Sequence, residues 1–361
     1  MIYASLNQWL PADGSGAQLE TVRSAVTIIG VFGAGILATA AVVRLKQTDD
    51  TYRLELAKDD RSDISALRSR YTTTAEQLGH PSPAIRLAGV YAMAALADDW
   101  AARGNTNEVQ TCIDVLCSII RTPPPADLAE HEQRADLEVR QTITRTIAAH
   151  LQHDTSPGWH GRDFDFTGAA FTGTHSFAGV HFTTGYFSFE RTLFTDSTLR
   201  FDDAHFDSGT VAFANARFIG HRMSFTNARI AGSRLRFDGV EFAGGKASFT
   251  NARFTGGRTS FYRAQFVNGT LRFDGAKFDG GETTFARAQF INGNVVFSHT
   301  RFTGGTVTFD SASQERVDWN VLASWQYPGV VLGQWATAPP VGWPLPARQR
   351  PGHGASARSE A

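Results

Sequence analysis

A phenylalanine repeat with a period of twelve runs through the second half of this 361-residue chain and limits what it can fold into. Of its 27 phenylalanines, 26 lie between Phe164 and Phe309. Two series of bulky residues each recur at every twelfth position, so that steps of five and seven positions alternate. The first series is Phe189, Phe201, Phe213, Phe225, Phe237, Phe249, Phe261, Phe273, Phe285, Phe297 and Phe309. The second is Phe182, Phe194, Phe206, Phe218, Ile230, Phe242, Phe254, Phe266, Phe278, Phe290 and Phe302. Such spacing predicts a solenoid whose core is built from both series.

Small residues precede the second series. Segments such as Asn215-Ala216-Arg217-Phe218 and Asn251-Ala252-Arg253-Phe254 resemble pentapeptide repeats, whose core is a small residue, a variable one, and then Leu or Phe. The resemblance covers about 150 residues and implies a right-handed, four-sided β-helix. The chain departs from the family's plain period of five by adding two positions to alternate steps, where pairs such as Gly256-Gly257 and Asn268-Gly269 recur. Because Gly and Asn tolerate positive φ, these pairs are predicted to form tight turns at corners.

Four steps to a coil give about 24 residues per coil and about six coils between Phe166 and Phe309. Outward-facing residues that are one coil apart then align in rows with a spacing of about 4.8 Å. One such row is His205, Arg229, Arg253, Lys277 and Arg301. Since stacked like charges repel one another, this row is a candidate surface for an anionic partner: a polyphosphate backbone, lipid headgroups or an acidic protein. A solvated face balanced by Asp207, Asp279 and Glu282 explains the same residues.

Twenty uncharged residues lie between Arg23 and Arg44. A helix of that length spans about 30 Å, so a single transmembrane helix is predicted at 24–43. A cleaved signal peptide is the alternative. The excess of basic residues after the segment predicts a single-pass cell-membrane protein, with the N-terminus outside and the C-terminal bulk cytoplasmic. Gly30, Ala34 and Ala38 recur at every fourth position and could pair two such helices in a homodimer.

Residues 44–153 are predicted to be α-helical. Ser82-Pro83 is a typical helix start, and apolar residues follow it at helical spacing. Pro83-x-x-Arg86 resembles the helices of HEAT-type repeats, although a plain helical bundle explains the pattern equally well. The whole arrangement is similar to a group of actinobacterial membrane-associated pentapeptide-repeat proteins whose role is not established.

The predicted fold class is mixed: one transmembrane helix, an all-α middle module, and then a right-handed quadrilateral β-helix. The boundaries are an extracytoplasmic N-terminus at 1–23, the transmembrane helix at 24–43, the helical module at 44–153, the β-helix at 160–312, a Trp-rich cap at 313–345 and a disordered tail at 346–361.

No catalytic motif stands out, and neither a metal site nor a cofactor site is expected. Cys112 and Cys117 are five positions apart in a predicted helix, which turns their side chains away from each other. His150, His153 and His160 are close in sequence, but their spacing matches no standard metal site. The chain is therefore predicted not to be an enzyme.

The charge balance bears on the partner. The chain has a formal net charge of -1, and residues 161–312 carry 16 Lys plus Arg against 13 Asp plus Glu. Pentapeptide-repeat proteins that mimic DNA need a long acidic face, which is missing here. The favoured function is a membrane-tethered, non-enzymatic interaction scaffold that presents a β-helix surface to a protein or anionic partner. The alternative is a nucleic-acid or topoisomerase-directed binding protein.

Overall fold

The computed structural model describes residues 16–125, 127–309, 313–314 and 330–331, without the side chains of residues 16–42, 56, 57, 59, 294, 313, 314, 330 and 331. Two compact units divide the chain, Met1–Ser69 and Arg70–Ala361. Most of the predicted N-terminal segment 1–23, the tail at 346–361 and all but four residues of the Trp-rich cap at 313–345 lie outside the described residues.

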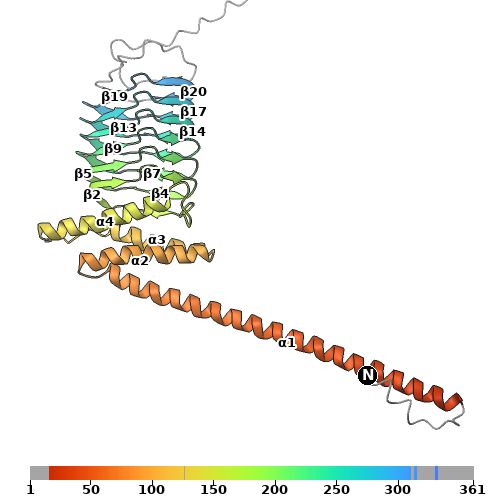
Figure 1. The fold of residues 1–361 in the computed structure, drawn as a ribbon. Helices are drawn as coiled ribbons and strands as arrows, with labels where there is room; N and C mark the ends of the chain where they lie inside the picture. Colours follow the sequence, from red (N-terminus) through yellow and green to blue (C-terminus); the bar gives the residue numbers. More distant parts are fainter. Residues whose placement is uncertain (1–15, 126, 310–312, 315–329, 332–361) are drawn as a thin grey trace, which may run out of the picture. The chain divides into compact units, whose positions relative to one another are not determined.

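Helix α1 runs without a break over the 63 residues Gly16–Leu78 (Figure 1). The predicted fold class included a separate transmembrane helix at 24–43, and this part of the prediction was wrong. Nowhere in the described part of the chain is a helix long and apolar enough to cross a membrane. The helix continues past Arg44 because neither Gly nor Pro occurs between that residue and Leu78.

The exposed turns of α1 beyond Arg44 carry charged side chains. Arg53 and Asp49 form an ion pair of 3.0 Å at the i, i+4 spacing that favours a helix. Gly30, Ala34 and Ala38 lie in the part of α1 whose side chains are not described, so the homodimer contact stays a prediction.

Three shorter helices follow: α2 at Pro83–Ala102, α3 at Thr106–Arg121 and α4 at Glu130–His150. Proline at the first turn starts α2, and the Asn105 side chain caps α3 by accepting a hydrogen bond from the Glu108 N–H. The apolar residues that predicted these helices are buried between them: Val90, Met93, Leu96, Ile113, Leu116, Ile143 and Ile147.

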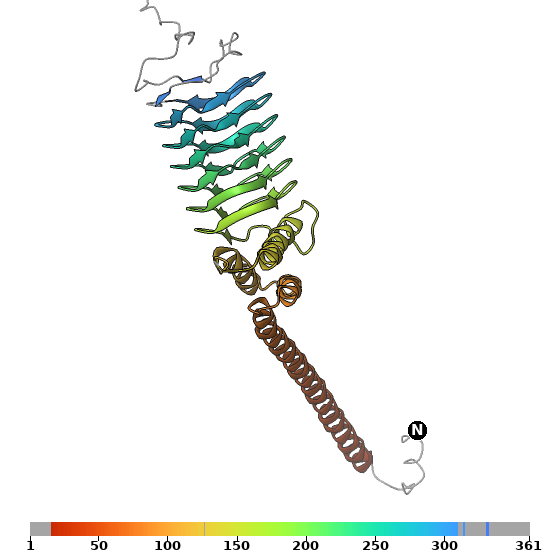
Figure 2. The same ribbon diagram turned by 90° about the vertical axis from the view of Figure 1, so that its left-hand side faces the viewer.

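The second half of the chain is a β-solenoid of about six coils, each with four sides (Figures 1 and 2). Side 1 holds β1 (Phe164–Asp165), β4 (Tyr186–Ser188), β7 (Thr210–Ala212), β11 (Arg234–Arg236) and the second halves of β14 (Arg253–Ser260), β17 (Lys277–Thr284) and β20 (Arg301–Thr308), with β22 (Val330–Val331) paired to β20. Side 2 holds the first halves of β2 (Ala170–Ser176) and β5 (Leu193–Arg200), then β8 (Arg217–Ile219), β12 (Glu241–Ala243), β15 (Gln265–Val267), β18 (Gln289–Ile291) and β21 (Ser313–Gln314).

The remaining two sides complete each coil. Side 3 holds the second halves of β2 and β5, then β9 (Arg222–Ser224), β13 (Lys246–Ser248), β16 (Thr270–Arg272) and β19 (Asn294–Val296). Side 4 holds β3 (His181–Phe182), β6 (His205–Phe206), β10 (Arg229–Ile230) and the first halves of β14, β17 and β20. The strands pair in parallel with the same side of a neighbouring coil, and pairs such as Arg217↔Glu241 and Arg229↔Arg253 are 24 positions apart, which confirms the predicted coil length.

Phenylalanine rings fill the interior as columns that run from coil to coil. Phe237 stacks on Phe213 and on Phe261 with ring centroids 4.9 and 4.8 Å apart, and it meets Phe249 edge to face at 6.1 Å. The predicted core residues are all buried. Burial of one such side chain contributes about 1.5–3 kcal/mol, and a favourable ring pair adds about 0.5–1.5 kcal/mol.

Glycines at the corners let the backbone of one coil approach the next. Gly257 has a φ of +71° and Asn268 one of +54°, which confirms the predicted positive φ, but Gly256 and Gly257 lie at a register shift inside β14 and not in a turn. A Cβ on Gly256 would lie 2.0 Å from the carbonyl oxygen of Ala231 in the preceding coil. Only a residue without a side chain fits there.

Replacing Gly256 with alanine should therefore lower the free energy of unfolding by about 1–3 kcal/mol, because the two coils must move apart. Gly79→Ala is the matched control, since its added Cβ would meet its nearest atom at 3.7 Å, an ordinary contact. Urea denaturation of both variants measures the difference. Equal stability of the two variants would contradict this view of the corner.

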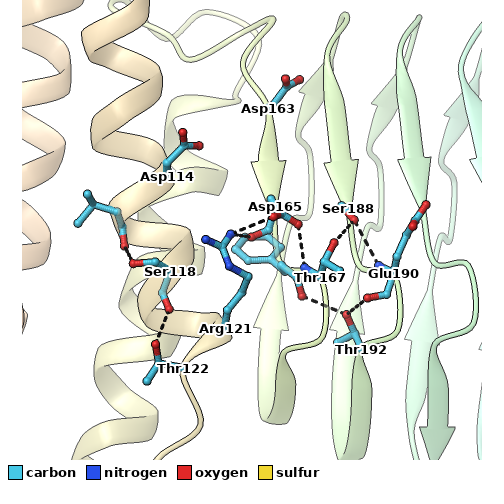
Figure 3. Close-up of polar contacts among 12 residues, drawn as sticks. Asp114, Ser118, Arg121, Thr122, Asp163, Asp165, Thr167, Ser188, Glu190 and Thr192 are labelled. Carbon is cyan, nitrogen blue, oxygen red and sulfur yellow. Dashed lines mark hydrogen bonds and ion pairs between the residues drawn. The ribbon is translucent and has the colours of Figure 1, made fainter.

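Helices α3 and α4 cover the first coil of the solenoid. Figure 3 shows Arg121 of α3 reaching Asp165 of β1, with Nη1 3.1 Å from a carboxylate oxygen. On α4, the Thr144 hydroxyl lies 3.2 Å from Nδ1 of the buried His175. The helices therefore close the N-terminal end of the phenylalanine core, a role that the sequence did not predict for them.

Candidate functional site

Side 4 carries the candidate residues in one row. We call His205, Arg229, Arg253, Lys277 and Arg301 the basic column. Backbone pairing places each member directly beside the next, from His205↔Arg229 to Lys277↔Arg301. Each member is exposed and is followed by a buried Phe or Ile, because side chains alternate between the two faces of a strand. The alignment expected from the repeat period is thus present in the structure.

Histidine extends this row by one coil. His181 pairs with His205 in register, and the two rings meet edge to face at 5.8 Å. The His153 ring stacks on His181 at 5.0 Å, and Nδ1 of His160 lies 3.1 Å from the His181 carbonyl oxygen. The helix-to-solenoid junction therefore adjoins the first member of the basic column.

Carboxylates balance only part of the basic column. Asp279 Oδ2 accepts from Nε of Arg253 at 2.9 Å. A hydrogen bond from the Thr303 hydroxyl, followed by the Arg253 and Lys277 charges, lowers the pKa of Asp279, so it stays ionised. Within the described residues, no carboxylate forms an ion pair with Arg229, Lys277 or Arg301.

The other two acids considered as counter-charges pair with residues outside the five-membered basic column: Asp207 with the histidine that precedes His205 in the row, and Glu282 with an arginine on side 1. Asp207 Oδ2 lies 2.5 Å from Nε2 of His181. Glu282 Oε1 is 3.4 Å from Arg258, which lies on side 1 and outside the basic column. Positive charge in the basic column is therefore less balanced than the spacing alone suggested.

Side 2 serves as an internal comparison. Its equivalent row is Arg217, Glu241, Gln265 and Gln289, again in register from coil to coil. Arg217 Nε and Glu241 Oε2 form an ion pair of 2.9 Å, so this row has no net charge. The solenoid thus presents a charged row and a neutral row on opposite sides.

The structure has a groove on side 1 that was not predicted from the sequence. It has a volume of about 1130 Å³, and we call it the side-1 groove. Its lining includes residues from three coils: Tyr186, then Arg234 and Arg236, then Arg258 and Tyr262. The repeat period could have found part of it, because Arg234 and Arg258 pair in register one coil apart.

The contacts of a junction histidine and the burial of the two cysteines indicate structural roles. His150 stacks on Trp159 at 4.0 Å, and its Nε2 lies 3.1 Å from Asp98. Cys112 and Cys117 are buried free thiols, and burial raises the pKa of each to about 12. In the part of the chain that the structure describes, no group of three or more His, Cys, Asp or Glu side chains could hold a metal ion.

Comparison with known proteins finds no matching family model, curated protein or solved structure. The structure itself shows a β-solenoid with phenylalanine at regular spacing, which is consistent with pentapeptide repeats.

Proposed function

We propose that this chain is a non-enzymatic interaction scaffold whose solenoid binds an extended anionic partner through the basic column. The observation that carries the proposal is the coil-to-coil register that aligns Arg229 with Arg253 and Lys277 with Arg301. A linear polyanion could meet one cation per coil, about every 4.8 Å. The repeat is assigned to the pentapeptide-repeat type on the small-x-Phe pattern, with two positions added to alternate steps.

Several contacts are needed for useful affinity. An exposed ion pair contributes only about 0.2–1 kcal/mol, and salt weakens it further. A column on a rigid core presents its charges in a fixed geometry. Binding a partner therefore costs little conformational entropy of the protein. Among the described residues, three members form no ion pair with a carboxylate and spread positive charge along the row: Arg229, Lys277 and Arg301.

Reversing two neighbouring charges, in the variant R229E/R253E, should weaken binding of fluorescently labelled inorganic polyphosphate by about 10-fold. Fluorescence anisotropy at low salt measures the dissociation constant. The matched control is R222E/K246E, because Arg222 and Lys246 are also exposed neighbours in adjacent coils, but on side 3. Both variants change the net charge by the same amount, and the control should stay within about twofold of the unmodified protein.

Equal weakening by both variants would mean that net charge alone attracts polyphosphate. No weakening by R229E/R253E would remove the basic column from the function. Either result contradicts the proposal, provided that circular dichroism shows both variants to be folded.

A further inference from the structure

The side-1 groove is a second candidate binding site, and its lining runs from Tyr186 past Tyr262 to Thr284 and Ala286 in the next coil. Tyr186 and Tyr262 lie three coils apart along the solenoid axis, which corresponds to about 14 Å. Between them the lining alternates long arginines with the short side chains of Thr210 and Ser260. The groove therefore suits an elongated ligand that lies along the axis across several coils.

Hydrogen bonds already hold one wall of the groove in place. The Tyr186 hydroxyl donates to Glu190 at 2.6 Å, and the pKa of Tyr186 is raised to about 12 by burial and by this hydrogen bond. Arg236 bridges Glu190 at 3.5 Å and Asp238 at 3.1 Å. The Ser260 hydroxyl in turn donates to Asp238. Little side-chain ordering would have to accompany ligand binding.

Two arginines leave donors for a ligand. Arg234 and Arg258 pair in register on adjacent coils, and both are exposed. Arg258 makes one contact of 3.4 Å with the half-exposed Glu282, and Arg234 has no carboxylate partner among the described residues. Guanidinium groups recognise planar carboxylates through paired N–H donors, so one carboxylate could be held by both arginines.

The other polar groups narrow the ligand class. Asp238, Glu190 and Glu282 line or border the same side, so a ligand with a charge on every unit would be repelled along most of its length. A ligand that combines spaced carboxylates with many hydroxyls suits both the acids and the arginines, because hydroxyls donate to carboxylates and accept from arginine.

We propose that the side-1 groove binds a carboxylate-bearing oligosaccharide, with one carboxylate between Arg234 and Arg258 and sugar hydroxyls on Asp238 and Ser260. Tyr262 forms part of the wall of the site. Its hydroxyl accepts from Nη1 of Arg287 at 3.3 Å, and the Arg263 guanidinium carbon lies 5.2 Å from the ring centroid. This site uses other residues than the basic column, so each proposal can fail without the other.

The test uses isothermal titration calorimetry on the full chain, and its probe is a tetrasaccharide in which glucuronate alternates with N-acetylglucosamine, so that only every second unit carries a carboxylate. Binding by the unmodified protein is expected, with at least 10-fold weaker binding of the fully methyl-esterified tetrasaccharide. The variant R234A/R258A should also weaken binding at least 10-fold. The matched control R222A/K246A removes the same charge from side 3 and should change the dissociation constant less than twofold.

Three results would overturn the proposal. One is the absence of binding by the unmodified protein at millimolar concentrations of this tetrasaccharide. Another is equal affinity for the acid and its methyl ester, which would exclude the arginine pair as the recognising group. The last is equal weakening by R234A/R258A and R222A/K246A. The polyphosphate experiment on R229E/R253E is read separately, so its failure is distinguishable from failure here.

Discussion

Phe237→Ala is expected to lower the free energy of unfolding of the solenoid by about 3–5 kcal/mol. The side chain is fully buried and sits in the middle of its column. Its ring stacks on Phe213 and Phe261 at 4.9 and 4.8 Å, and it meets Phe225 and Phe249 edge to face at 6.2 and 6.1 Å. Alanine would leave a cavity shared by three coils, which cannot collapse without breaking the pairing on the sides.

Urea denaturation followed by circular dichroism measures this loss. The control is Ile219→Ala on side 2, where the side chain is 37% exposed and should cost less than about 1 kcal/mol. A loss of less than about 1 kcal/mol at Phe237 would mean that the column is not the main source of stability. Because each coil contacts only its neighbours, the loss of stability can also be observed as unfolding of the few coils around Phe237 before the rest of the solenoid.

Acid should destabilise the solenoid between about pH 6.5 and pH 4 through two buried histidines. His175 and His221 are 2% and 1% exposed, and burial lowers the pKa of each from 6.5 to about 4. The unfolded chain takes up these protons below pH 6.5, whereas the folded chain takes them up only near pH 4. Stability is therefore complete above pH 6.5 and is lost as the pH falls.

For one such histidine, the loss between pH 7 and pH 5 is about 2 kcal/mol. His221→Ser isolates this effect, because Ser197 and Gly245 occupy the same corner in the adjacent coils. The difference in unfolding free energy between the two pH values should shrink by about 2 kcal/mol in this variant, because the linked proton uptake is removed. His131→Gln, at an exposed site on α4, should leave the difference unchanged. An unchanged pH dependence in His221→Ser would contradict the burial argument.

The solenoid could be predicted from the sequence because one period determines both its core and its surface. Once Phe213 and Phe237 were taken to stack one coil apart, the alignment of Arg229 with Arg253 followed by counting, and the structure has both. The glycines at the corners could be predicted for the same reason, since Gly257 has the positive φ that the repeat implied.

The parts outside the period were harder to predict. The covering of the first coil by α3 and α4 depends on contacts such as Arg121 with Asp165 and Thr144 with His175, which join residues 44 and 31 positions apart without any repeat. The boundary predicted between the transmembrane helix at 24–43 and the helical module at 44–153 rested on local hydropathy, yet α1 continues through Arg44 because no Gly or Pro occurs from there to Leu78.

A repeat period also does not reveal where the surface has a groove. Counting by 24 aligns neighbours in the lining of the side-1 groove, such as Arg234 with Arg258 and Arg236 with Ser260, but it does not show that these rows border a hollow. No sequence pattern connected Arg236 with Asp238 in the lining or with Glu190 beside it.

The salt dependence of polyphosphate binding tests the central claim most directly. Each cation that meets the polyanion releases counterions, so the logarithm of the binding constant falls linearly with the logarithm of the salt concentration. If the basic column binds polyphosphate, the slope should become shallower in R229E/R253E by the amount that about two lost phosphate contacts account for. It should be unchanged in R222E/K246E. Equal slopes for the unmodified protein and R229E/R253E would contradict the claim that side 4 binds the partner.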